Sequence, residues 1–187
     1  MPGKRIAGAA LLLLGWIAAL PAAAAATEGH AAISVTTRTT KKQFAPRHVL
    51  AIWIENDQGQ FVRTLKYRAK TYRMYLVEWR KATRGVKTPL VDAITGASLR
   101  KHETQSVTWD GKDWQGQTSP DGFYRVRVEF SEKNGRGPVT PARYIRFMKG
   151  EKAVTTKPKP LPYFKDIVVE YKPSPPGTDG SPNTSSE

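Results

Sequence analysis

Hydrophobic and polar positions alternate in several short segments of this chain. The clearest is residues 123–130, FYRVRVEF, where apolar side chains alternate with arginine and glutamate from Tyr124 to Phe130. Since successive side chains of a strand point to opposite faces of a sheet, this pattern predicts a strand with one buried face. Residues 31–40 alternate in the same way and are rich in β-branched side chains, which predicts the first strand of the fold.

A second kind of segment is apolar on both faces. Residues 48–56, HVLAIWIEN, predict a central strand, and the turn at residues 57–59 sends residues 60–67 back as its hairpin partner. Shorter strands are predicted at residues 106–109, 143–148 and 166–171.

One stretch has helical periodicity instead. Between residues 71 and 84, apolar and aromatic side chains recur at spacings of three and four, which predicts a short amphipathic helix. These side chains are Tyr72, Tyr75, Leu76 and Trp79. A polar loop at residues 85–103 follows, and a loop of this length inside a compact domain is usually functional or disordered.

Short strands at this spacing, with one minor helix, predict a mainly all-β fold. We expect an immunoglobulin-like antiparallel β-sandwich over residues 27–172. Residues 173–187 are rich in Pro, Gly, Ser and Thr, so we expect them to form a disordered tail.

The first 26 residues have the pattern of an export signal. Lys4 and Arg5 precede an apolar run at residues 6–20 that is too short for a good membrane span. The alanines up to Ala26 offer a signal-peptidase site, so we expect cleavage after Ala26 and a periplasmic mature protein. An uncleaved N-terminal anchor is the alternative interpretation.

Composition narrows the possible chemistry. Cysteine is absent, which excludes disulfides, thiolate chemistry, iron–sulfur clusters and c-type haem. The formal net charge is +14, and loss of Lys4 and Arg5 with the signal would lower it by two. Because export argues against nucleic acid as a partner, this charge favours lipid headgroups in peripheral membrane contact, an acidic protein or a phosphate-bearing cofactor. A solvated basic surface is the other interpretation.

Residues 107–130, VTWDGKDWQGQTSPDGFYRVRVEF, carry a first resemblance. They resemble the Trp-Asp-Gly … Pro-x-Gly-x-Tyr hairpin of the immunoglobulin-like domain in flagellar hook-cap (FlgD-type) proteins, in which Trp109 and Tyr124 would be core aromatics. Together with residues 46–65 and the last strand, this hairpin resembles the DUF2271 family of predicted periplasmic proteins over residues 31–172. The likeness implies a fold and says little about function.

Residues 92–98, DAITGAS, carry a second resemblance. They resemble the acceptor motif of proteins with covalent FMN, Asp-x-x-(Ser/Thr)-Gly-Ala-(Ser/Thr). In such proteins a periplasmic flavin transferase of the ApbE family uses FAD as donor and joins FMN by a phosphoester to the last hydroxyl. The resemblance implies that Ser98 is the acceptor. The implied recognition positions are Asp92, Thr95, Gly96 and Ala97.

This second resemblance implies a periplasmic electron-transfer flavoprotein. Such a chain has no catalytic residues or metal site of its own, so we expect it not to be an enzyme. Its partners would be the ApbE-type flavin transferase and a PepSY-type membrane reductase or another redox partner. The transferase would activate the Ser98 hydroxyl with its own base and metal. A non-enzymatic, FlgD-like periplasmic binding or assembly module is the alternative function.

Residues near the motif are further candidates. Arg100 and Lys101 would neutralise the flavin phosphate, and His102 is a candidate contact for it. Ser98, Asp92 and His102 are not expected to form a triad, because no nucleophile-elbow pattern surrounds the serine.

The remaining candidates keep an ordinary structural interpretation. Asp, Thr, Gly and Ser are common turn residues, so DAITGAS has the alternative interpretation of a surface turn. His30 and His48 lack metal-ligand spacing. The aromatic rings of the predicted helix would either stack on an isoalloxazine ring or belong to the core.

Overall fold

A computed structural model describes residues 26–41, 45–132, 137–141 and 143–175. The predicted signal peptide up to residue 25 and most of the predicted tail lie outside these ranges. Within the described residues, no helix is long and apolar enough to cross a membrane.

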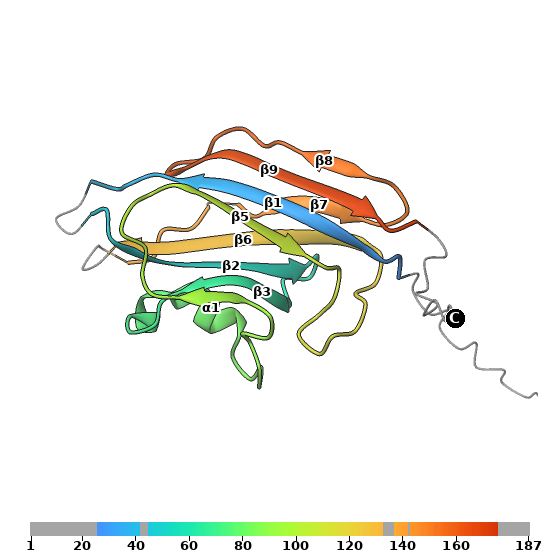
Figure 1. Cartoon of the computed structure of the whole chain (residues 1–187), viewed down its shortest axis with the longest axis horizontal. Helices are drawn as coiled ribbons and strands as arrows, with labels where there is room; N and C mark the ends of the chain where they lie inside the picture. Colours follow the sequence, from blue (N-terminus) through green and yellow to red (C-terminus); the bar gives the residue numbers. More distant parts are fainter. Residues whose placement is uncertain (1–25, 42–44, 133–136, 142, 176–187) are drawn as a thin grey trace, which may run out of the picture.

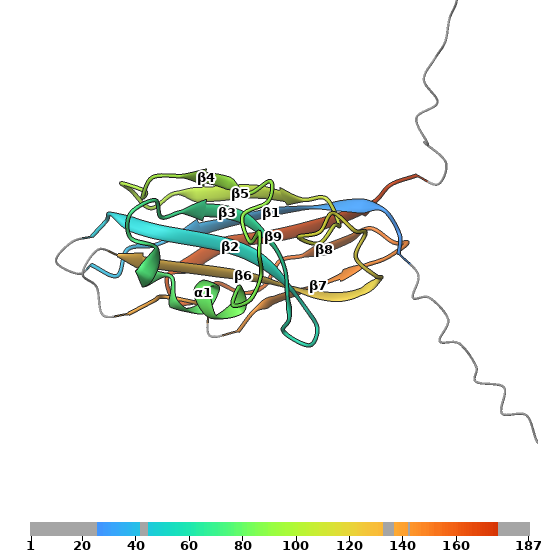
Figure 2. The same cartoon turned by 90° about the horizontal axis from the view of Figure 1, so that it is seen from below.

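Two β-sheets pack face to face (Figures 1 and 2). The first sheet has the strand order β5-β1-β9-β8, and the second has the order β4-β3-β2-β6-β7. The strands of the first sheet are β1 (Gly29–Thr37), β5 (Thr104–Trp109), β8 (Val154–Thr156) and β9 (Phe164–Pro173). Those of the second are β2 (His48–Asn56), β3 (Phe61–Arg68), β4 (Ile94–Gly96), β6 (Gly122–Glu132) and β7 (Ile145–Lys149). The predicted all-β sandwich is confirmed, although β4 runs parallel to β3 and makes the second sheet mixed.

The main core lies between the two sheets. The predicted apolar face of β6 is buried there, from Tyr124 to Phe130, together with Trp109 of β5. The rings of Trp109 and Tyr124 lie 4.8 Å apart, which confirms that both are core aromatics. The Tyr124 hydroxyl donates a hydrogen bond of 2.6 Å to the carbonyl of Pro120 and so closes the turn before β6.

The segment at residues 107–130 is not a hairpin. Its two strands, β5 and β6, belong to different sheets, so the turn-rich loop between them crosses from one sheet to the other. The hairpin expected from the FlgD-type resemblance is therefore wrong in its pairing. The strand that pairs with β6 on one side is β2, and the strand on its other side is β7.

A second, smaller core explains why β2 is apolar on both faces. A 3-10 turn (Arg73–Tyr75) and α1 (Val77–Ala82) cover the outer face of the second sheet, and Trp79 packs there against Tyr67 with ring centroids 4.7 Å apart. The carboxylate of Glu129 on β6 accepts hydrogen bonds from the first backbone N–H groups of α1. The predicted helix is confirmed in position but is shorter than expected, since it is broken at Leu76.

Two strands were not predicted. The polar loop expected at residues 85–103 contains β4, and the short strand β8 pairs with β9 at an edge of the first sheet. Both strands are three residues long, too short for alternation to distinguish them from a loop.

Candidate functional site

Strand β4 holds the FMN-type motif at the edge of the second sheet. Thr95 pairs with Tyr67 of β3, and Gly96 pairs with Arg68. Just beyond the motif, the backbone of Leu99 exchanges two hydrogen bonds of 3.0 and 2.8 Å with His48 at the start of β2. Ser98 therefore lies between two backbone attachments, in a segment that follows the sheet edge instead of projecting from it.

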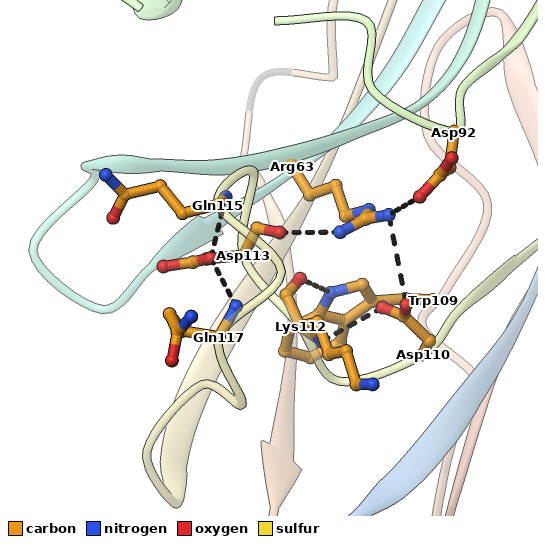
Figure 3. Close-up of polar contacts among 8 residues, drawn as sticks. All are labelled: Arg63, Asp92, Trp109, Asp110, Lys112, Asp113, Gln115 and Gln117. Carbon is orange, nitrogen blue, oxygen red and sulfur yellow. Dashed lines mark hydrogen bonds and ion pairs between the residues drawn. The ribbon is translucent and has the colours of Figure 1, made fainter. Parts of the chain in front are cut away.

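Asp92, the first residue of the motif, is tied to the body of the protein by a buried arginine (Figure 3). One guanidinium nitrogen of Arg63 donates to the Asp92 carboxylate at 2.6 Å, and the other donates to the carbonyl of Asp113 at 2.5 Å. The Arg63 side chain is only 6% exposed, whereas that of Asp92 is 79% exposed. The Asp92 backbone has a positive φ of 51°, so this ion pair holds the motif at a sharp turn.

The loop that receives Arg63 is itself well ordered by hydrogen bonds (Figure 3). The Asp113 carboxylate accepts hydrogen bonds from the backbone N–H groups of Gln115 and Gln117, and the indole of Trp109 donates to the carbonyl of Lys112 at 2.7 Å. The anchor of the motif therefore rests on a hydrogen-bonded turn and a core tryptophan.

Gly96 leaves room for a second arginine. A Cβ atom built on Gly96 would lie 2.8 Å from a guanidinium nitrogen of Arg68, and the Nε of Arg68 donates to the carbonyl of Ala97 at 3.0 Å. A side chain at this position would displace the guanidinium from its hydrogen bond. The small residue in the motif thus has a structural role inside this chain, in addition to the access to an enzyme expected from its size.

Ser98 lines a half-open pocket of about 310 Å³. Its wall contains two tyrosines, and three exposed cationic side chains surround it. The lining residues include Tyr72, Tyr75, Arg47, Lys70 and Arg100. A volume of this size lies at the lower end of the range of ligand pockets. Aromatic walls suit a planar ring, and cations suit a phosphate, so the side chains present fit a flavin mononucleotide.

The aromatic stripe of the predicted helix divides between two roles. The Trp79 indole is buried beneath α1 and donates to the Thr64 hydroxyl at 3.0 Å, which makes it a core residue. Tyr72 and Tyr75 are only partly buried, with ring centroids 6.2 Å apart, and both line the pocket. The core interpretation is therefore confirmed for Trp79, and stacking on an isoalloxazine ring stays a prediction for Tyr72 and Tyr75.

His102 turns away from the pocket into a buried cluster. One ring nitrogen contacts the Thr37 hydroxyl at 2.9 Å, and the other contacts the Glu132 carboxylate at 3.0 Å. Its ring stacks on that of His48, with centroids 4.0 Å apart. Both nitrogens are thus engaged, which overturns the expected contact between His102 and a flavin phosphate.

Burial sets the charge state of this cluster. Burial lowers the pKa of His48 to about 4, and it also lowers the pKa of His102 despite the hydrogen bond to Glu132. Both rings are therefore neutral near pH 7, and the neutral His102 ring donates a hydrogen bond to the Glu132 carboxylate. The cluster joins the ends of β1 and β6 to the segment that follows Ser98.

The other residues that the sequence suggested for the site differ in their positions and partners. Lys101 forms an exposed ion pair of 3.1 Å with Glu103, whereas Arg100 lines the pocket. Asp92 is bound by Arg63 and His102 by Thr37 and Glu132, so no triad forms with Ser98. Among the described residues, no group of three His, Asp or Glu side chains could hold a metal ion.

Four basic residues of the site were not predicted from the sequence. Arg63 and Arg68 anchor the motif, and Arg47 and Lys70 flank the pocket. Arg63 and Arg68 both lie 29 residues before their partners, so only the pairing of β3 with β4 brings them together. In the sequence, the one indication of Arg63 and Arg68 was their position within or just after a predicted strand.

Comparison with known proteins identifies a single family over most of the chain. The family model for DUF2271, described as a predicted periplasmic protein, matches residues 30–147. This range includes the motif, the pocket and both arginine anchors. No curated protein and no solved structure matches the chain.

Proposed function

Since the chain belongs to the DUF2271 family of predicted periplasmic proteins, we propose that it is a periplasmic electron-transfer flavoprotein with FMN joined to Ser98. The attachment is a phosphoester made by an ApbE-type flavin transferase. The flavin, when bound, supplies the redox chemistry, and the protein supplies position and electrostatics.

The observation that carries the proposal is the composition of the pocket beside Ser98. The motif borders two tyrosine rings and three cationic side chains, which suit a flavin ring and its phosphate. Here Ser98 shares a pocket with Tyr72, Tyr75 and Arg100. The serine that the motif singles out therefore lines a pocket with both aromatic and basic side chains.

The side chains around Ser98 have distinct roles under this proposal. Arg100, Lys70 and Arg47 would hold the phosphate by charge, as exposed cations next to the acceptor hydroxyl. Tyr72 and Tyr75 would lie against the ring and exclude water from one of its faces.

The arginine anchors would prepare the acceptor for the transferase. Ala97 is exposed and Ser98 is partly exposed, so an enzyme can reach the hydroxyl without unfolding the sandwich. Because Arg63 and Arg68 fix the turn on both sides of the motif, little conformational entropy remains to be lost on binding. The basic surface would favour an acidic redox partner, of which a PepSY-type membrane reductase is the proposed example.

The test is mass spectrometry of the exported protein after co-expression with an ApbE-type transferase. We expect the added mass of FMN less one water, mapped to the peptide that contains Ser98, and we expect Ser98→Ala to abolish it. Ser106→Ala is the matched control, since Ser106 is an exposed serine outside the motif. If the peptide stays unmodified and the protein colourless, the proposal fails and a non-enzymatic, FlgD-like binding module becomes the better interpretation.

A further inference from the structure

The end of the sandwich opposite Ser98 contains a buried cation. Lys149, the last residue of β7, is fully buried, and its ammonium group donates to the Asp121 carboxylate at 2.8 Å and to the carbonyl of Thr27 at 2.5 Å. A buried charge is costly unless it is paired and hydrogen-bonded. These two acceptors therefore form a site built around Lys149.

Thr27 supplies every polar group that it has to this site. Its backbone nitrogen donates to Asp121 Oδ1 at 2.9 Å, and its hydroxyl donates to Asp121 Oδ2 at 2.6 Å. Its carbonyl accepts from Lys149. Burial acts to raise the pKa of Asp121, but the hydrogen bonds from Lys149 and Thr27 outweigh it and lower that pKa.

The backbone that follows Thr27 is held just as closely. A Cβ atom on Gly29 would lie 2.6 Å from the carbonyl of Lys172, and one on Gly111 would lie 2.9 Å from the carbonyl of Gly29. The residue before Thr27 differs, because Ala26 is exposed. The backbone therefore changes from exposed at Ala26 to hydrogen-bonded to the sandwich at Thr27.

We infer that this site is a receptor for the N-terminus that processing creates, with the free α-ammonium group of Thr27 bound to Asp121. The inference rests on the cleavage expected after Ala26 and not on flavin attachment. In that cleavage, a signal peptidase adds water across the Ala26–Thr27 peptide bond. The hydroxyl of water goes to the carbonyl carbon of Ala26, and the nitrogen of Thr27 gains the proton and leaves as an amine that is protonated near pH 7.

Cleavage changes the strength of a contact that already has the right geometry. Before cleavage, the nitrogen of Thr27 is a neutral amide with one N–H, and afterwards it is a cation with three. The Asp121 carboxylate is charged in both states, so cleavage adds a direct attraction between opposite charges to a hydrogen bond that already exists. Processing at this bond therefore tightens the attachment of β1 to the start of β6, whereas cleavage at a neighbouring bond would place the charge about one residue away.

The first experiment identifies the N-terminus of the exported protein by intact mass and peptide sequencing. We expect the mature chain to begin at Thr27. A mature chain that begins at any other residue, or an uncleaved chain, overturns the inference. Because Ser98 is not involved, flavin attachment succeeds or fails independently of this result.

The second experiment measures the contribution of the ammonium group. Two chains are compared by thermal unfolding, one starting at Thr27 and one starting at Ala23, which retains four preceding alanines. We expect the chain starting at Thr27 to have a Tm about 2 to 5 °C higher. The difference should disappear in an Asp121→Asn background and persist in Glu103→Gln, a control at an exposed carboxylate.

These comparisons remain decisive if Asp121→Asn weakens the fold. The two chains with the natural Asp121 differ only in the N-terminal extension, so equal Tm values for that pair alone overturn the inference. A Tm difference that persists unchanged in Asp121→Asn also overturns it, because the effect would then come from the extension and not from the carboxylate.

Discussion

The cations at the two ends of the sandwich differ in their exposure to solvent. At the end with Ser98, Arg47, Lys70 and Arg100 are exposed around a half-open pocket. At the other end, Lys149 is fully buried and paired with Asp121. Exposed cations keep their hydration and are free to meet an anion, whereas a buried cation must be satisfied within the fold. The first arrangement suits ligand binding, and the second suits stability.

The two ends are well separated. The start of β1 and the end of β9 lie at one end, and the start of β2 and the end of β6 lie at the other (Figure 1). Strand β1 connects them with nine residues. At roughly 3.3 Å per residue this strand spans about 30 Å. Substitutions at one end should therefore add to those at the other without direct coupling.

The largest effect should come from removing the partner of Lys149. Asp121→Ala leaves a buried ammonium group with one neutral acceptor, and we expect it to lower the free energy of unfolding by about 3 kcal/mol. Glu103→Ala at the pocket end removes an exposed partner of Lys101 and should cost less than about 0.5 kcal/mol. Urea unfolding of both variants checks the contrast, and similar losses for the two would contradict it.

Acid should act mainly on the pocket end. The pKa of His48 is about 4 in the folded protein because of burial, below its ordinary value of 6.5. The unfolded chain therefore binds the proton first, so stability is present above pH 6.5 and is lost as the pH falls toward 4. We expect a loss of about 3 kcal/mol from this group between pH 7 and pH 4.

Variants assign this pH dependence to a residue. His48→Leu should flatten the stability profile between pH 7 and pH 4, measured by urea unfolding at each pH. His30→Gln should leave the profile as it is, since His30 is an exposed histidine at the opposite end. Hydrogen bonds from Thr40 and Thr39 offset burial and lower the pKa of Glu132, which adds a loss of the same sign at lower pH. A profile unchanged by His48→Leu would show that the stacked cluster does not control acid sensitivity.

The next effect concerns the anchor of the motif. Arg63→Met keeps an apolar stem but removes the hydrogen bonds to Asp92 and Asp113, and we expect it to cost about 2 kcal/mol. It should also slow flavin attachment to Ser98, because the motif loses one of its fixed ends. Arg84→Met, at an exposed arginine, is the matched control. The fraction of FMN-modified protein over time measures the effect, and equal rates in the two variants would contradict a role for the anchor.

Local patterns predicted more of the fold than of the site. Strand β6 could be predicted because its alternation is set by one buried face, and β2 because α1 covers its second face. The crossing between β5 and β6 could not be predicted, since a turn signal does not show whether two strands share a sheet. The DAITGAS segment is contiguous and was visible in the sequence, whereas Arg63 and Arg68 meet it only through the pairing of β3 with β4.

The smallest effect tests whether the exposed cations serve encounter instead of stability. Arg100→Ala should change the free energy of unfolding by less than about 0.5 kcal/mol, because the side chain is exposed. In flavin-modified protein, however, it should slow reduction by the anion dithionite about twofold at low salt, measured by stopped-flow absorbance. The difference should vanish at high salt, where the charge is screened. A slower rate that persists at high salt would mean that Arg100 positions the flavin. The cations would then have a structural role at both ends of the sandwich, and the contrast between the ends would fail.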